Sequence, residues 1–155
     1  MCIRDRVIRG GAYRGGKRIA RPVSLMDPVP TIVAIAGLDP QPEMDGRALG
    51  EPVRNPDCER DPDILIQISE SQVARALRTP RYQYYVSAPH LDEWQDERSD
   101  VYVEECLYDL ETDPYELLNL VGLPAYHALK EKLREKLVGR IVRSGEPLPR
   151  IVPLT

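Results

Sequence analysis

Four polar residues near the middle of the chain have side chains that could bind a polar ligand such as a sugar. They are Ser69, Glu70, Gln72 and Arg75. As a set, their hydroxyl, carboxylate, amide and guanidinium groups supply both hydrogen-bond donors and hydrogen-bond acceptors. All four lie in the segment ISESQVAR, which links two stretches with the composition of β-strands. The alternative interpretation is an ordinary hairpin loop that carries a cross-strand charge.

The acidic run from Asp109 to Glu116 has carboxylates at a spacing that could suggest a metal loop. A calcium loop needs a glycine at its centre, and this run has none. His90 is a lone histidine without a second ligand at metal spacing, so we expect it on the surface. These residues therefore predict no metal site in this chain.

Four short stretches are rich in β-branched, aromatic and other apolar residues, which favours β-strands. They span residues 64–68, 73–78, 82–87 and 101–108. Short connections between such stretches favour antiparallel neighbours. The sequence therefore predicts a four-stranded antiparallel sheet.

One long amphipathic segment follows, from about residue 125 to residue 142. Apolar residues recur in it every four positions, at Leu129, Leu133, Leu137 and Ile141. This period is typical of a helix with one buried face, and Pro124 suits its first turn. We expect the helix to cover one face of the sheet, which gives an α+β fold class.

The segment from Cys106 to Val121 predicts a corner between a strand and a helical turn. The strand should stop at Asp109, and Asp113-Pro114 should then open a short helical turn. In that turn Asp113 would cap the free N–H groups, and Glu116 would lie at the N3 position and reach back toward the cap.

Composition indicates a globular chain and excludes several partner classes. The chain has 155 residues, of which 42% are hydrophobic and 30% charged, with a formal net charge of -4. This charge gives no reason to expect nucleic acid or an anionic membrane surface as a partner. No apolar run approaches the roughly 20 residues that cross a bilayer. Three cysteines without CxxC spacing do not indicate a compartment, so the localisation stays undetermined.

Four stretches, in order, resemble motifs of one enzyme family. LYDLETDPYELLNLV, from Leu107 to Val121, resembles the LYDLxxDPxExxNL signature near the C-terminus of sulfatases, which belong to the alkaline-phosphatase-like superfamily. The other three are similar to the family's PVSxxDxxPTxxxxAGI, xDGxSL and RAVRTxxYKYI motifs. They are PVSLMDPVPTIVAIAGL (22–38), MDGRAL (44–49) and ARALRTPRYQYYV (74–86).

The resemblance implies a division of the chain into parts. Residues 1–6, MCIRDR, resemble the adaptor sequence that often heads reading frames assembled from metagenomic reads, so we expect a non-native start. Residues 7–62 would be a strand end (7–9), a helix (28–36) and a connecting segment from the large α/β sulfatase domain. Residues 63–144 would form the C-terminal α+β subdomain, and residues 145–155 a tail.

The resemblance also implies a chemistry that this chain does not hold by itself. Sulfatases hydrolyse sulfate esters with a formylglycine nucleophile and a calcium ion, and both would belong to the full-length family member. Cys2 to Arg6 superficially resembles the nucleophile motif, but Arg4 stands where the family has a small residue or proline. We therefore assign no catalytic, cofactor-binding or metal-binding residue.

The partner implied is the missing N-terminal sulfatase domain, and the implied substrate of the whole enzyme is a sulfated small molecule or sugar. In the family the C-terminal subdomain helps close the substrate pocket, and ISESQVAR is the pocket-facing segment that we expect here. The alternatives are the C-terminal part of a related phosphoester or phosphonate monoester hydrolase, and a stand-alone α+β binding module.

Overall fold

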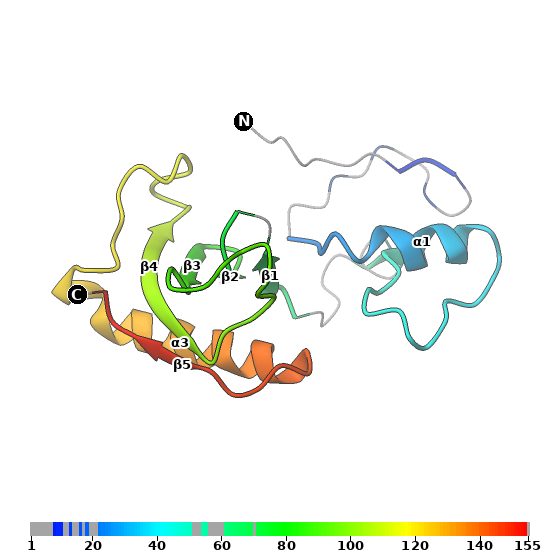
Figure 1. Ribbon diagram of the computed structural model, residues 1–155. Helices are drawn as coiled ribbons and strands as arrows, with labels where there is room; N and C mark the ends of the chain where they lie inside the picture. The colour runs from blue at the N-terminus through cyan, green and yellow to red at the C-terminus, as the bar shows by residue number, and fades with distance from the viewer. Residues whose placement is uncertain are drawn as a thin grey trace. The chain divides into compact units, whose positions relative to one another are not determined.

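The computed structural model describes residues 8–10, 13, 16, 18, 22–50, 54–55, 61–69 and 71–154. The chain divides into two compact units, Met1–Pro62 and Asp63–Thr155. The helices and strands carry the labels of Figure 1. No helix among the described residues is long and apolar enough to cross a membrane.

The first unit contains the helix α1, Pro28–Ile35, close to the predicted range. Pro28 lies at the start of the helix, where its fixed φ suits a first turn. Gly37 has a φ of 78°, which lets the chain leave the helix in a left-handed turn.

The pair Asp27-Pro28 is typical of a capped helix start, but Asp27 does not cap α1 with its side chain. Its backbone is already in the right-handed helical region, whereas an N-cap residue normally has an extended conformation that aims its side chain at the first turn. The carboxylate instead accepts hydrogen bonds from the backbone N–H groups of Ser24 and Arg47, both at 2.9 Å. Asp27 therefore joins the segments on either side of α1.

Gly46, in the MDGRAL stretch, is required by a close approach of the chain to itself. A Cβ atom at this position would overlap the backbone carbonyl of Met26. Thr31 of α1 holds the same region, because its hydroxyl accepts a hydrogen bond from the N–H of Leu49 at 3.0 Å. This part of the motif therefore has a structural explanation.

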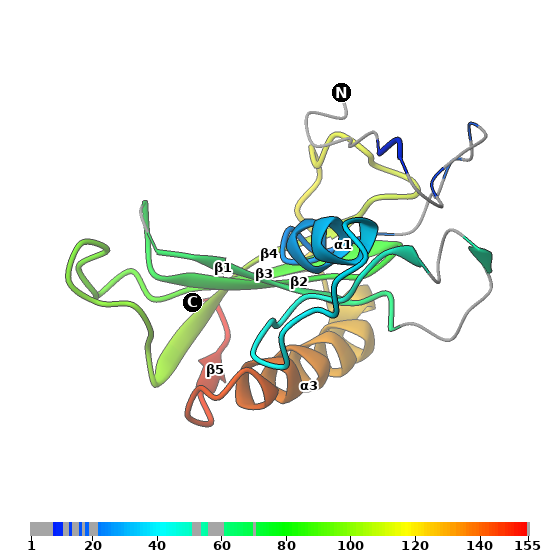
Figure 2. The ribbon, with the colours of Figure 1, turned by 90° about the vertical axis from the view of Figure 1, so that its right-hand side faces the viewer.

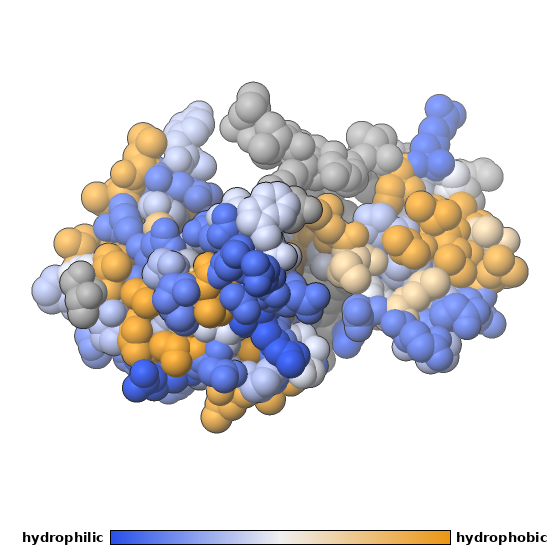
Figure 3. All heavy atoms as spheres, viewed as in Figure 1, coloured by the Kyte–Doolittle hydropathy of each residue, from blue (hydrophilic) through white to orange (hydrophobic). Residues whose placement is uncertain are grey.

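Large apolar side chains of the first unit are exposed on and around α1. Figure 3 shows them as an orange patch, and its members include Leu25, Met26, Val29 and Ile32. A patch of this kind is uncommon on an isolated soluble unit.

The strand end expected at residues 7–9 is not found in the described part of this segment. Ile8 and Arg9 belong to no strand, and Gly10 pairs with Tyr13 in an isolated bridge. Val7 lies outside the described residues.

The second unit is a five-stranded mixed sheet with strand order β1-β2-β3-β4-β5. Four strands occur where the sequence predicts them and pair antiparallel. They are β1 (Ile64–Ile68), β2 (Ala74–Arg78), β3 (Tyr82–Ser87) and β4 (Val101–Asp109). The fold class α+β is therefore confirmed, and the number of strands is corrected.

The additional strand is β5, Arg150–Val152, in the segment predicted to be a tail. It pairs parallel to β4, and the N–H of Arg150 donates to the carbonyl of Asp100 at 2.8 Å. Three residues are too few to show a period of two, and the prolines that flank the segment suggested a loop. Those prolines lie outside β5, at an edge of the sheet, where a missing N–H is tolerated.

A β-bulge in β4 decides which of its side chains face the core. The register shifts between Tyr85 and Val86, which pair with Cys106 and Glu104, so Glu105 has no partner. Tyr102 and Glu104 are buried before the bulge, and Leu107 and Asp109 are buried after it. A strict two-residue alternation along β4 would have placed Cys106 and Tyr108 inward instead.

The helix α3, His127–Arg143, covers one face of the sheet, as predicted (Figure 2). A short 3-10 turn, η1 (Pro124–Tyr126), precedes it. Leu133, Leu137 and Ile141 are at most 3% exposed and pack against side chains of the inner sheet face, among them Leu77 and Tyr84. The stripe of apolar residues on this helix therefore forms the core of the unit.

Candidate functional site

The segment predicted to bind substrate joins β1 to β2, and no hydrogen bond links the side chains of its described candidates, Ser69, Gln72 and Arg75. Ser69 and Gln72 are half-buried, and neither side chain forms a hydrogen bond within the described part of the chain. Glu70 lies outside the described residues. Arg75 is in β2 and only 1% exposed.

Arg75 uses its guanidinium inside the protein. Its Nε and Nη2 atoms both donate to the carboxylate of Glu146 at 2.9 Å. Nη2 also donates to the carbonyl of Glu97, and Nη1 to the carbonyl of Ala74. Arg75 therefore ties β2 to the loop before β4 and to the segment after α3, while its contact with substrate stays a prediction.

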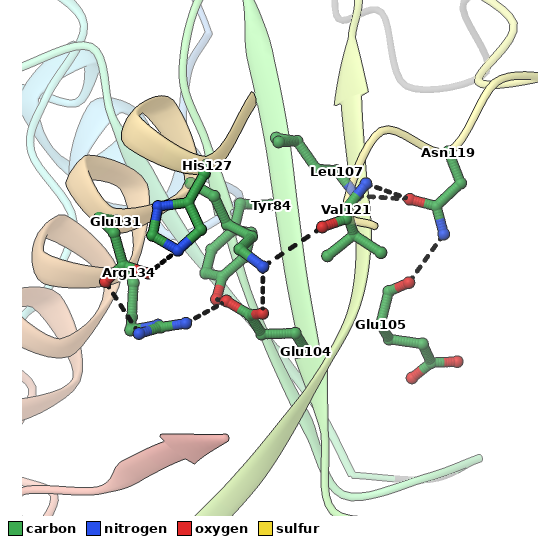
Figure 4. Close-up of polar contacts among 10 residues, drawn as sticks. Tyr84, Glu104, Glu105, Leu107, Asn119, Val121, His127, Glu131 and Arg134 are labelled. Atoms are coloured by element: carbon green, nitrogen blue, oxygen red, sulfur yellow. Dashed lines mark hydrogen bonds and ion pairs between the residues drawn. The ribbon is translucent and has the colours of Figure 1, made fainter. Parts of the chain in front are cut away.

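A cluster of charged side chains lies between the sheet and α3 (Figure 4). At its centre is the carboxylate of Glu104, in β4, which is fully buried. Lys130 Nζ and Arg134 Nη2, one helical turn apart on α3, each lie 2.7 Å from a different oxygen of this carboxylate. The hydroxyl of Tyr84, in β3, donates to Glu104 at 2.8 Å.

The environment of Glu104 favours its ionised form. Burial raises the pKa of the carboxyl group, but the contacts with Lys130, Arg134 and Tyr84 lower it by more, so the pKa lies below its usual value. Burial and the neighbouring carboxylate raise the pKa of Tyr84 well above its ordinary range. At neutral pH Glu104 therefore holds no proton to give, and its chemistry is to pair with two cations.

Lys130 extends this cluster to the segment that follows β4. Its Nζ atom also donates to the carbonyl of Val121 at 3.3 Å. Beside it lies a pocket of about 320 Å³, whose lining includes the exposed His127 and residues of the same segment. The pocket is formed by Val121, Gly122, Leu123, Pro124, His127, Lys130 and Leu154.

Asn119 acts as a clamp between β4 and the chain that returns past it. Its Oδ1 atom accepts hydrogen bonds from the N–H groups of Leu107 and Val121, at 3.0 and 3.1 Å. Its Nδ2 atom donates to the carbonyl of Glu105 at 2.8 Å. The side chain thus replaces the strand partner that β4 lacks here.

We expect Asn119→Ala to lower the free energy of unfolding by about 1 kcal/mol, because it removes three hydrogen bonds in a partly exposed place. Asn119→Asp keeps the acceptor and loses the donor, so its loss should be smaller. Urea unfolding of the three proteins measures the difference. Equal stability of Asn119→Ala and the parent chain would show that the clamp is dispensable.

The acidic run 109–116 is structural, as predicted, but no helical turn forms in it. Asp109 accepts two hydrogen bonds from the guanidinium of Arg81, which hold the pKa of Asp109 below its usual value. Asp113 Oδ2 accepts from the N–H of Leu118, five residues further on, at 2.7 Å, instead of capping the first N–H groups of a helical turn. Glu116 has a φ of 58° and accepts from Gln83 instead of reaching back to Asp113, which corrects its predicted role.

Metal-ligating residues do not gather in the described ranges, where no group of three or more His, Cys, Asp or Glu side chains could hold an ion. His90 is exposed, as expected. Cys106 is a free thiol in β4, while Cys2 and Cys58 lie outside the described residues. The donor set of the described residues therefore does not fit the calcium ion that the sequence resemblance implies for a longer protein.

The residues that form the buried cluster were not singled out from the sequence. Glu104 follows Tyr102 by two positions, so a strand period does place it on the inner face. Lys130 and Arg134 are four residues apart, which places them on one side of a helix. The sequence does not show that the side of α3 carrying Lys130 and Arg134 packs against β4, and this is the contact that forms the cluster.

Comparisons with known proteins point to one family. The chain is 24% identical over 140 residues to an ulvan-active sulfatase from Formosa agariphila, a match that covers 84% of the chain and 24% of that protein. No protein-family model matches the chain.

Solved structures agree with the sequence comparison. A candidate sulfatase from Bacteroides thetaiotaomicron matches 77% of this chain and 25% of its own, with a TM-score of 0.61 and 26% identity. A 2-O GAG sulfatase matches with a TM-score of 0.60 and 25% identity, over 77% of this chain and 24% of its own. The phosphonate monoester hydrolase of Agrobacterium radiobacter shares the fold at a TM-score of 0.53 and 22% identity, over 76% of this chain and 24% of its own. The chain thus spans about a quarter of the length of the proteins it matches.

Proposed function

Because this chain is a homologue of the sulfatases and matches about a quarter of their length, we propose that it forms the C-terminal part of a sulfatase, a sulfuric ester hydrolase. The agreement of the sequence match with two structural matches at 25% identity or more carries the proposal. In this proposal the nucleophile, modified to formylglycine, and the calcium ligands belong to residues outside this chain.

The substrate that we propose for the whole enzyme is a sulfated carbohydrate. This follows the printed names of relatives, one active on ulvan and one a 2-O GAG sulfatase. The fold is also shared with a phosphonate monoester hydrolase, which keeps that activity as the second candidate. The DNA upstream of this reading frame tests the sulfatase proposal, because the proposal requires an in-frame Cys/Ser-x-Pro/Ala-x-Arg motif there, and turnover of a sulfate ester against a phosphonate monoester by the longer enzyme separates the two candidates.

We expect the purified chain to have no sulfatase activity of its own. Incubation with 4-nitrophenyl sulfate should release no more 4-nitrophenolate than a buffer blank does. Turnover that follows the protein through a second chromatography step would show that the chain carries its own catalytic groups.

In the longer enzyme, the link between β1 and β2 is the part of this chain that we propose to face the substrate. The side chains of Ser69 and Gln72 lack hydrogen-bond partners within the described ranges, so they are available to a sugar hydroxyl. Arg75 is committed to Glu146 and is the weaker candidate.

Replacing Ser69 and Gln72 together with alanine in the longer enzyme should raise KM for a sulfated oligosaccharide about fivefold or more. That is the scale of one or two lost hydrogen bonds, and kcat should change less. Gln41→Ala, at an exposed position of the first unit, is the matched control and should leave both constants unchanged. An unchanged KM in the double variant would contradict the pocket-closing role while leaving the sulfatase assignment intact.

A further inference from the structure

The loop between β3 and β4 displays the only tryptophan of the chain to solvent. Trp94 lies in this loop, residues 88–100, and its side chain is 81% exposed. A tryptophan is the largest apolar side chain, and it is among the residues most enriched at the centres of binding interfaces. A ring this exposed is accessible to another molecule, and the charges around it decide which kind of molecule it suits.

Local hydrogen bonds hold the loop around Trp94 in one conformation. Asp92 Oδ1 accepts from the N–H of Trp94 at 3.0 Å, and the carbonyl of Asp92 accepts from the N–H of Asp96 at 2.8 Å. Further along, Arg75 donates to the carbonyl of Glu97 at 2.9 Å, which fastens the loop to β2. A partner would therefore meet a surface that needs little ordering.

The side chains around Trp94 are mostly negatively charged, which indicates a positively charged partner. Five carboxylates lie within six residues of it, against one guanidinium, that of Arg98. None of the five forms an ion pair with a residue that the structure describes. The cation–π contacts between described residues use the rings of Tyr82 and Tyr102 and leave that of Trp94 open. The five are Asp92, Glu93, Asp96, Glu97 and Asp100.

We propose that this loop is a docking surface for a basic polypeptide segment, with an arginine or lysine of the partner stacked on the indole of Trp94. The electron-rich face of an indole attracts cations, and the surrounding carboxylates raise the local concentration of a basic partner. A sulfated polysaccharide would instead be repelled by five carboxylates. The surface lies between β3 and β4, whereas the segment proposed to face the substrate lies between β1 and β2.

The test titrates the full chain with an octapeptide of alternating arginine and glycine in an isothermal titration calorimeter at low salt. Fluorescence of Trp94 reports the same titration, since no other tryptophan contributes. We expect saturable binding, a change in Trp94 fluorescence and a loss of affinity with added salt. Trp94→Ala should weaken binding about 2- to 30-fold, whereas Tyr115→Ala, which removes another exposed ring, should not.

A charge-matched pair of variants separates docking on this loop from general attraction to an acidic protein. Glu93→Gln with Glu97→Gln should weaken binding several-fold, and Glu43→Gln with Glu135→Gln, which changes the net charge equally, should have little effect. Equal losses in the two double variants, or in Trp94→Ala and Tyr115→Ala, would overturn the proposal. So would a fluorescence change with a neutral glucose hexasaccharide but not with the peptide, because the loop would then be a carbohydrate platform.

Discussion

Replacing Glu104 with glutamine is expected to lower the free energy of unfolding by about 3 kcal/mol. The exchange keeps the shape of the side chain but leaves Lys130 and Arg134, which are 12% and 22% exposed, without their shared carboxylate. Urea unfolding followed by circular dichroism measures the effect. Glu135→Gln, on the exposed side of α3, is the matched control and should stay within about 0.5 kcal/mol of the parent chain.

The same exchange should flatten the dependence of stability on pH. The pKa of Glu104 is lowered in the folded protein, so its contribution is fully present above the unfolded value of 4.5 and is lost as the pH falls through the folded value. Between about pH 5 and pH 3 the parent chain should therefore lose more stability than Glu104→Gln does. If the two curves stay parallel, or if Glu104→Gln is as stable as Glu135→Gln, the cluster does not contribute as described.

Arg75→Gln is expected to destabilise the second unit by about 2 to 3 kcal/mol, because it breaks a nearly buried ion pair. The guanidinium is 1% exposed and Glu146 is 15% exposed, so water compensates only part of the loss. Thermal and urea unfolding measure the change, and Arg98→Gln, at an exposed position, should leave stability unaltered. If Arg75→Gln leaves the stability of this chain unchanged, and the same substitution raises KM in a longer enzyme, the substrate contact predicted from the sequence is favoured over the structural role.

The motif residues that resemble the sulfatase signature acquire physical roles in the fold. Asn119 clamps the returning chain to β4, Asp109 fastens the turn before β3 through Arg81, and Gly46 permits a close backbone approach. None of these roles needs a substrate. The signature in this part of the chain is therefore explained by the architecture that it builds.

Charged residues on α3 serve two different functions that periodicity alone could not separate. Lys130 and Arg134 look like members of a solvated face, as do Lys132 and Glu135, which are exposed. The former two pair with the carboxylate of Glu104, which lies on the inner face of β4 opposite them. Their distinction depends on a contact between positions about 30 residues apart.

The amino-acid sequence is enough to predict the positions of β1 to β4, the helix α3 with its stripe of leucines and the likeness to sulfatases, because these depend on periodicity and on short motifs along the chain. The fifth strand, the pairing of Glu104 with two cations of α3 and the burial of Arg75 became apparent only in the folded structure. β5 is too short to carry a period and exists because β4 offers it an open edge. Glu104 and Arg75 are charged residues that stay inside because partners from distant segments, Lys130, Arg134 and Glu146, meet them there.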